Sequence, residues 1–104
     1  MLSILIPIYN FDVRAFVTQL SDQAQQLSVA AEIICLDDLS EPAFKKLNAD
    51  LSSISLVKYI ESETNLGRSA VRNKLAEFSS YEHLLFLDCD GECVTDDYLQ
   101  LYAA

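Results

Sequence analysis

Four short apolar runs, each ending in polar residues, are the feature that most constrains the fold of this chain. The last run, residues 83–90, reads HLLFLDCD and ends abruptly in two acids separated by a cysteine. A run of this kind predicts a strand that is buried on both faces and reaches solvent at its final residues. Side chains two positions apart on a strand point the same way, so we expect the Asp88 and Asp90 carboxylates to converge.

The pairing of Asp88 with Asp90 favours a functional interpretation. Two carboxylates held side by side repel each other unless a proton or a metal ion lies between them. That repulsion brings no evident structural gain, and hard divalent cations prefer oxygen ligands. The pair therefore predicts a metal site at the end of this strand.

The segments between the apolar runs have the three- and four-residue spacing of amphipathic helices. We expect strands at residues 2–8, 33–36 and 54–60, the last centred on Leu56 and Val57, and from residue 83 onward. We expect helices at residues 12–27, 42–51, 67–78 and from Thr95 with Asp96 and Asp97. Helix starts are expected to be capped by Asn10 or Asp12 and by Ser40 with Glu41. The second and third helices are expected to bury Ala43, Phe44, Leu47 and Leu51, and Val71, Leu75 and Phe78.

Strand and helix alternate four times, which predicts an α/β fold. Such alternation implies a mainly parallel sheet with helices on both faces, built from four βα units. The 104 residues contain no linker, repeat or low-complexity tract, so we expect residues 1–104 to form a single domain.

Charge and cysteine content exclude several classes of partner and site. The net charge of -9 argues against nucleic acid and anionic membranes as partners, because both require a basic surface. No stretch is long enough to span a membrane. The three cysteines, Cys35, Cys89 and Cys93, form an odd set without a second Cys or His pair, which argues against structural zinc and indicates reduced thiols and a cytoplasmic location.

Polar residues gather at the ends of the predicted strands, and in an open parallel sheet ligands bind outside these carboxyl ends. They are Tyr9 and Asn10, Asp37 and Asp38, Asn65 and Gly67, and Asp88 and Asp90. Taken singly, most have an ordinary structural explanation: Asp37 and Asp38 as turn formers, Gly67 as a helix-entry residue, and Arg68 with Arg72 as a solvated helix face. Their convergence is a stronger indication than any one of them.

Four motifs, in this order and at these separations, resemble the nucleotide-binding half of family-2 glycosyltransferases. They are LSILIPIYN, EIICLDDLS, NLGRSAVRN and LLFLDCD, and the resemblance covers essentially the whole chain. It implies the Rossmann-like GT-A fold of nucleotide-diphospho-sugar transferases. It also implies a hexosyltransferase-type enzyme that moves sugar, with inversion, from a nucleotide-diphosphate sugar donor to a saccharide or lipid-linked acceptor in cell-surface polysaccharide biosynthesis.

The resemblance implies roles for residues of the first two motifs. Tyr9, which follows Pro7 and precedes Asn10, resembles the residue that stacks on the nucleobase. Asp38, with Asp37 beside it, resembles the acid that reads the base edge through an N–H group.

The third motif is similar to the family's base and phosphate contacts. Arg72 and Asn73 resemble these contacts and are reached through Asn65 and Gly67. A guanidinium at this point could form charge-assisted hydrogen bonds to a phosphate or to the base.

The fourth motif resembles the family's Asp-X-Asp (DXD) pair, with Asp88 near the ribose and Asp90 on the metal. A nucleotide diphosphate adds negative charge to an acidic protein, so Mn2+ or Mg2+ is expected between these carboxylates and the phosphates. The metal would stabilise the leaving diphosphate as a Lewis acid.

The sequence departs from the family pattern in two places. Gly91, followed by Glu92, stands where a further acid is usual, which leaves the third metal ligand open. The general base and the acceptor site of the family lie beyond the metal motif, so we expect them beyond Ala104 in a longer protein, at the cytoplasmic face of the membrane. The chain alone is expected to keep a donor-binding surface with little or no transferase activity.

Two other interpretations stay open. The run LLFLDCDG also resembles the motif of haloacid-dehalogenase-type phosphohydrolases, in which Asp88 would attack phosphorus and Asp90 would act as acid and base. Glu92 stands where that family has Thr, and only a short helix is expected to follow. The non-enzymatic alternative is a nucleotide-binding module whose exposed apolar face or edge promotes self-association.

Overall fold

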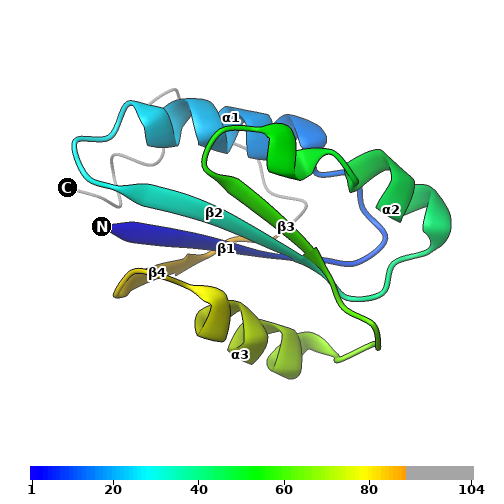
Figure 1. Cartoon of the computed structure of the whole chain (residues 1–104). Helices are drawn as coiled ribbons and strands as arrows, with labels where there is room; N and C mark the ends of the chain where they lie inside the picture. The colour runs from blue at the N-terminus through cyan, green and yellow to red at the C-terminus, as the bar shows by residue number, and fades with distance from the viewer. Residues whose placement is uncertain (89–104) are drawn as a thin grey trace.

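A four-stranded parallel sheet forms the centre of the molecule, with strand order β3-β2-β1-β4 (Figure 1). The computed structural model describes residues 1–88, so the helix expected from Thr95, as well as Cys89 and Cys93, lies outside the described residues. The strands are β1 Leu2–Ile8, β2 Ala31–Asp37, β3 Val57–Glu61 and β4 His83–Phe86. The helices are α1 Arg14–Gln25, α2 Pro42–Asn48 and α3 Arg68–Phe78, with one 3-10 turn, η1, at Leu51–Ser53.

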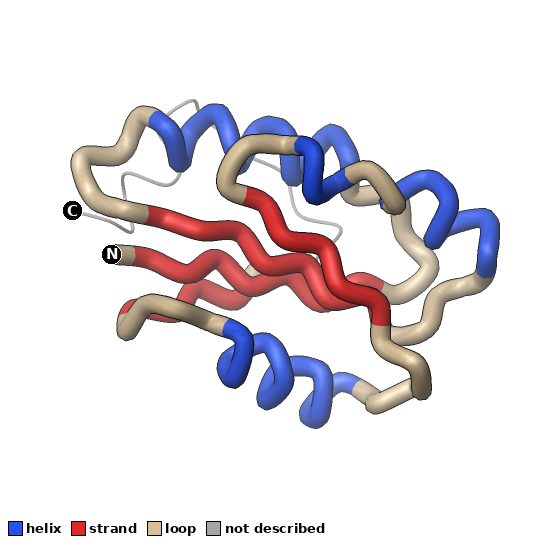
Figure 2. Tube along the Cα trace, viewed as in Figure 1, coloured by secondary structure: helices blue, strands red, loops and turns tan. Residues whose placement is uncertain are grey.

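Helices cover both faces of the sheet, as predicted. Figures 1 and 2 show α1 and α2 on one face and α3 on the other. The alternation of side chains along β1 explains this: Ile4 and Ile6 belong to the core cluster beneath α1, whereas Leu5 packs with Val71 and Leu75 of α3. A strand covered on both faces needs a continuous apolar run, which is what β1 and β2 have.

The prediction that the fourth apolar run is buried on both faces is wrong for the described residues. In the described sheet β4 lies at the edge and pairs only with β1, so His83 is exposed and Leu84 is 40% exposed. The third strand also begins later than predicted. Leu56 has a φ of 70° and is 43% exposed, which breaks the extended backbone until Val57.

The predicted buried faces of two helices need correction. In α2, Ala43 and Leu47 are exposed, and the buried residue is the polar Asn48. The Asn48 amide donates to the carbonyl of Phe11 at 2.7 Å and accepts the N–H of Val13 at 3.2 Å, so α2 secures the backbone that enters α1. In α3, Val71 and Leu75 are buried as predicted, but Phe78 in the last turn is 43% exposed.

The predicted helix caps are also wrong. The N-cap residue of α1 is Val13 and that of α2 is Glu41, and the side chain of neither residue forms a capping hydrogen bond. Asp12 pairs with the Arg14 guanidinium at 2.8 Å and also accepts the Arg14 backbone N–H at 3.1 Å, and these two interactions lower the pKa of the Asp12 carboxyl. No helix in residues 1–88 is both long and apolar enough to span a membrane.

A buried acid ties the amino ends of the strands together. Glu32, at the start of β2, accepts the Ser3 hydroxyl and the Ser80 N–H, each at 2.6 Å, and lies 3.9 Å from the Lys58 ammonium. Glu32 is only 8% exposed. One carboxylate thus joins β1, β2, β3 and the turn that precedes β4.

We expect Glu32→Ala to lower the free energy of unfolding by about 1–3 kcal/mol, because it leaves the Ser3 hydroxyl and the Ser80 N–H without their acceptor. Urea denaturation followed by circular dichroism measures the change. Glu82→Ala, which removes an exposed acid from the same turn, is the control and should change stability by less than about 0.5 kcal/mol. If both variants lost the same free energy of unfolding, the buried Glu32 network would contribute no more to stability than an exposed acid does.

The Cys35 thiol is expected to titrate only at high pH, because burial raises its pKa to about 12. The folded-state pKa exceeds the unfolded value of about 8.5, so the stabilising effect is complete below that value and is lost as the pH rises toward 12. We expect the free energy of unfolding of a Cys89→Ser, Cys93→Ser variant to fall over this range more steeply than when Cys35→Ala is added. Tyr59, whose pKa is raised by burial and by its hydrogen bond to Glu61, is present in both variants, so most of its contribution cancels in the comparison. Parallel pH profiles would contradict the prediction.

Candidate functional site

The carboxyl ends of the two central strands are joined at one rim of the sheet. Ile8 pairs with Asp37 in the register of β1 and β2, and the Asp38 N–H donates to the Ile8 carbonyl at 2.8 Å. The segments that follow these strands therefore leave the sheet side by side. The loop before α3 joins the same rim, since the Ser62 N–H donates to the Asp37 carbonyl at 2.8 Å.

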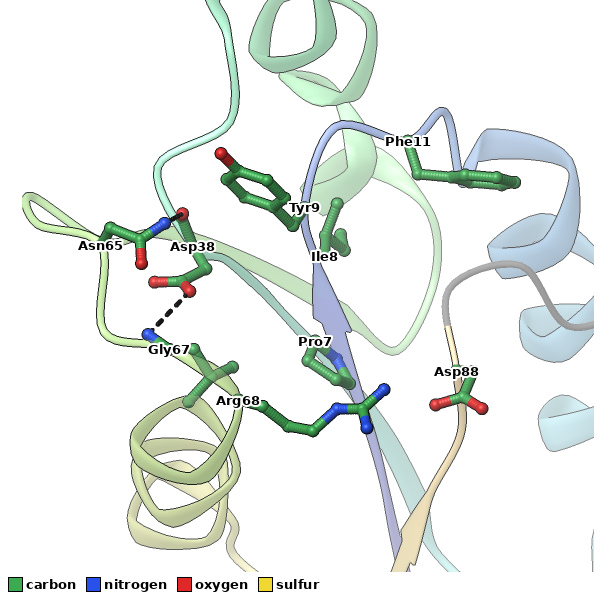
Figure 3. A pocket seen from close by; sticks show the side chains of 10 residues that line it. Pro7, Ile8, Tyr9, Phe11, Asp38, Asn65, Gly67, Arg68 and Asp88 are labelled. Carbon is green, nitrogen blue, oxygen red and sulfur yellow. Dashed lines mark hydrogen bonds between the residues drawn. The ribbon is translucent and has the colours of Figure 1, made fainter.

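A cavity of about 570 Å³ opens at this rim (Figure 3). Its walls come from the end of β1, the segment after β2, the start of α3 and the segment after β4. The lining residues are Pro7, Ile8, Tyr9, Phe11, Asp38, Asn65, Gly67, Arg68, Val71 and Asp88. Residues that are far apart in the sequence thus form one concave surface.

Asp38 holds the loop before α3 against the end of β2. Its carboxylate accepts the Leu66 N–H at 2.6 Å and the Gly67 N–H at 3.0 Å, while the Asn65 amide donates to the Asp38 carbonyl at 3.3 Å. Asp38 is only 7% exposed. Each carboxylate oxygen can accept more than one hydrogen bond, so Asp38 keeps acceptor capacity on the cavity side.

Gly67 is required by its backbone conformation rather than by lack of space. Its φ is 82°, a region that L side chains rarely adopt, and no atom lies within 4 Å of the position that a Cβ would take. This turn brings the two N–H groups of Leu66 and Gly67 onto one carboxylate and starts α3 at Arg68.

Asp37 and Asn10 form a second network behind the cavity. Asp37 is fully buried and accepts both the Ser40 hydroxyl and, at 2.8 Å, the Ser40 N–H. The Ser40 hydroxyl accepts the Asn10 N–H, and the Asn10 side chain accepts the Glu41 N–H, both at 2.8 Å. Asn10 has a φ of 51°, so this network fixes an unusual turn immediately after Tyr9. Neither Asn10 nor Asp37 lines the cavity, and both instead support residues that do.

Two aromatic side chains stand over the cavity. Tyr9 is 54% exposed and Phe11 is 40% exposed, and both line the wall. In Figure 3 the Tyr9 ring stands above Asp38 and Asn65, whereas Phe11 lies toward Asp88. An exposed ring beside hydrogen-bonding groups is suited to stacking against a flat, polar ligand.

Besides Asn10 and Asp37, two further predicted site residues of the described structure do not line the cavity, and one predicted residue lies outside the described residues. The Arg72 guanidinium carbon lies 4.4 Å from the centre of the Phe86 ring, a cation–π contact between α3 and β4. Arg72 and Asn73 are absent from the cavity wall, and Asp90 lies outside the described residues. Asp88 is exposed and lines the cavity.

Carboxylate oxygens are the donor type that a hard divalent cation prefers, and Asp88 presents one to the cavity. Residues 1–88 do not by themselves assemble three or more His, Cys, Asp or Glu side chains around one point. The fit of a divalent ion therefore rests here on the chemistry of Asp88 alone.

Phe11 and Arg68 are cavity residues that were not predicted as part of the site. The pattern along α3 assigned Arg68 to a solvated helix face together with Arg72. A usable signal was present: Arg68 directly follows Gly67, so it begins a helix at the rim where the other site residues gather. Phe11, two residues beyond Tyr9, follows the first strand in the same way.

Comparisons with known proteins identify related sequences. A family model described as glycosyl transferase family 2 matches residues 3–104. A Haemophilus influenzae protein described as an uncharacterized glycosyltransferase is 38% identical over 95 residues, which is 89% of this chain and 30% of that protein.

Similar solved structures share the fold. The mannosyltransferase PcManGT from Pyrobaculum calidifontis, in complex with GDP-Man and Mn2+, has a TM-score of 0.79 at 15% identity, over 94% of this chain and 30% of that chain. TarS 1-349 from S. aureus, in complex with UDP-GlcNAc, has a TM-score of 0.72 at 24% identity, over 98% of this chain and 30% of that chain. The chain therefore spans a little under a third of the length of these proteins.

We expect Asp38→Asn to lower the free energy of unfolding by about 1.5–3 kcal/mol, because the amide keeps one acceptor oxygen and its NH2 group cannot accept the second of the two N–H groups that the carboxylate now accepts. Hydrogen exchange should localise the loss to the amides of Leu66 and Gly67. Asp50→Asn, at an exposed position away from the cavity, is the matched control. Unchanged exchange at both amides would contradict the role assigned to Asp38.

Proposed function

The chain belongs to glycosyl transferase family 2, and from this membership we propose that its cavity binds a nucleotide-diphosphate sugar, with Mn2+ or Mg2+, for transfer of the sugar to an acceptor. The observation that carries the proposal is that Tyr9, Asp38 and Asp88, which follow three different strands, line one cavity. Each has the chemistry that one part of such a donor requires.

The nucleobase would bind at the side of the cavity where Tyr9, Asp38 and Asn65 lie. The exposed Tyr9 ring offers a stacking surface, and base–aromatic stacking contributes about 1–3 kcal/mol per base. The Asp38 carboxylate is held by two backbone N–H groups and keeps acceptor capacity for a base N–H. Pro7 gives the cavity an apolar wall, and the Asn10 and Asp37 network keeps Tyr9 in place.

The diphosphate and the metal would bind at the opposite side, near Asp88. Asp88 with Asp90 supplies carboxylate oxygens for a divalent ion, which when bound would stabilise the negative charge on the leaving diphosphate. PcManGT, a protein of the same fold, binds GDP-Man and Mn2+, which supports the proposal of a nucleotide-sugar donor and a divalent ion. Arg72 and Asn73, in the middle of α3, remain predicted base and phosphate contacts.

The remaining parts of the reaction are proposed from family membership. We assign no residue of this chain as the catalytic base and expect it, with the acceptor site, in a region that corresponds to the part of the relatives' length not spanned here. Inversion, a saccharide or lipid-linked acceptor, cell-surface polysaccharide biosynthesis, a cytoplasmic location at the membrane face and self-association stay predictions. The haloacid-dehalogenase interpretation is not favoured, because the family match and the relatives described above are glycosyltransferases.

We expect UDP or GDP to raise the Tm of the chain in the presence of Mn2+, by roughly 10 °C at about 100 times the Kd, and to have little effect in EDTA. Both nucleotides are tested because the base is not assigned. Asp90→Asn should remove the metal-dependent part of the shift, whereas Asp22→Asn, an exposed acid on α1, should leave it unchanged.

Two results would contradict the proposed function. One is the absence of any shift with either nucleotide and Mn2+. The other is a metal-dependent shift with fluoroberyllate alone, which would favour a phosphohydrolase that uses Asp88 as its nucleophile.

A further inference from the structure

Arg68 is the basic residue that lines the cavity. All seven Lys and Arg residues of the chain fall within residues 1–88, and the other six are absent from the cavity wall. Arg68 is the first residue of α3 and follows the turn at Gly67. Figure 3 shows its side chain running beneath Pro7, with the guanidinium directed toward Asp88.

The Arg68 guanidinium has no partner among residues 1–88. The described ion pairs involve Arg14, Lys58 and Lys74, and Arg72 stacks on Phe86. A guanidinium has five N–H donors in a planar fork that matches the oxygens of a phosphate. An arginine that extends into a cavity without a protein acceptor is therefore available to an anion that enters from solvent.

The charges around the cavity explain why such an anion needs Arg68. The chain carries a net charge of -9, and the cavity wall itself contains two acids, Asp38 and Asp88. A nucleoside diphosphate placed there would be repelled unless cations neutralise it. A divalent ion near Asp88 supplies part of this neutralisation, and Arg68 is the cationic side chain placed to supply the rest.

We propose that Arg68 binds the diphosphate oxygens of the donor and thereby makes the cavity select nucleoside diphosphates over nucleosides. The inference rests on the proposed function and adds a residue that the sequence pattern had assigned to a solvated helix face. Arg72, the predicted phosphate contact, lies one helical turn further along α3 and is occupied by the Phe86 ring. Arg68 reaches the part of the cavity that lies between the proposed base site and Asp88 (Figure 3).

Calorimetric titration of the chain with UDP and GDP, and with uridine and guanosine, in Mn2+ tests the proposal. We expect Arg68→Gln to weaken nucleoside diphosphate binding by at least about tenfold and to leave nucleoside binding unchanged. Arg68→Lys, which keeps the charge but not the fork, should show an intermediate loss. Lys74→Gln is the matched control, because it removes one positive charge from the same helix outside the cavity.

The outcomes separate this inference from the proposed function. If the unmodified chain binds neither nucleotide, the proposed function fails and the inference fails with it. If the unmodified chain binds a diphosphate and Arg68→Gln binds it equally well, or no more weakly than Lys74→Gln does, the inference alone is overturned. A loss confined to Arg72→Gln would overturn it in favour of the predicted contact. Thermal melting of each variant shows whether it is folded. If Arg68→Gln does not fold, Arg68→Lys is the variant that tests the inference.

Discussion

The parallel pairing of β1 with β2 is the constraint on which the rest of the structure depends. The two strands stay in register from Leu2 and Ala31 to Ile8 and Asp37, so they end at the same level. Backbone hydrogen bonds then continue the ladder, since the Asp38 N–H meets the Ile8 carbonyl and the Ser62 N–H meets the Asp37 carbonyl. Three successive crossovers make all four described strands parallel, so the segments that follow the strands meet at this rim and form the cavity.

The two adjacent acids at the end of β2 have different roles: one supports the turn behind the cavity and the other lines the cavity. Asp37 is fully buried and binds Ser40, so it fixes the turn behind Tyr9. Asp38, one residue later, lines the cavity and holds the loop that starts α3. Successive side chains of an extended segment point in opposite directions, so adjacent identical residues meet different surroundings.

Much of the fold could be predicted because β1, β2 and the apolar stripes of α1 and α3 report burial directly. The rim could also be predicted, since Tyr9, Asp38, Asn65 and Asp88 all follow strands in a parallel sheet. The errors come from features that depend on tertiary position. Burial on both faces was expected of the fourth strand, but Leu84 is exposed because β4 lies at the edge of the described sheet.

Polar residues were harder to interpret than apolar ones. Asn48 is buried because loop backbone groups of Phe11 and Val13 need partners, a requirement that no spacing pattern reports. Arg68 and Arg72 share one helical stripe, yet one enters the cavity and the other stacks on Phe86. A periodic pattern specifies the direction of a side chain around its helix but not the neighbours that it meets there.

The carboxylate of Glu32 has a consequence for how such a domain can change over time. It joins Ser3, Ser80 and Lys58 at the amino ends of the strands, whereas the cavity lies at their carboxyl ends. One anchor of the sheet thus lies at the end opposite to the cavity. A substitution in an exposed part of the loops around the cavity can therefore leave the distant Glu32 anchor, and with it the alignment of the strands, undisturbed.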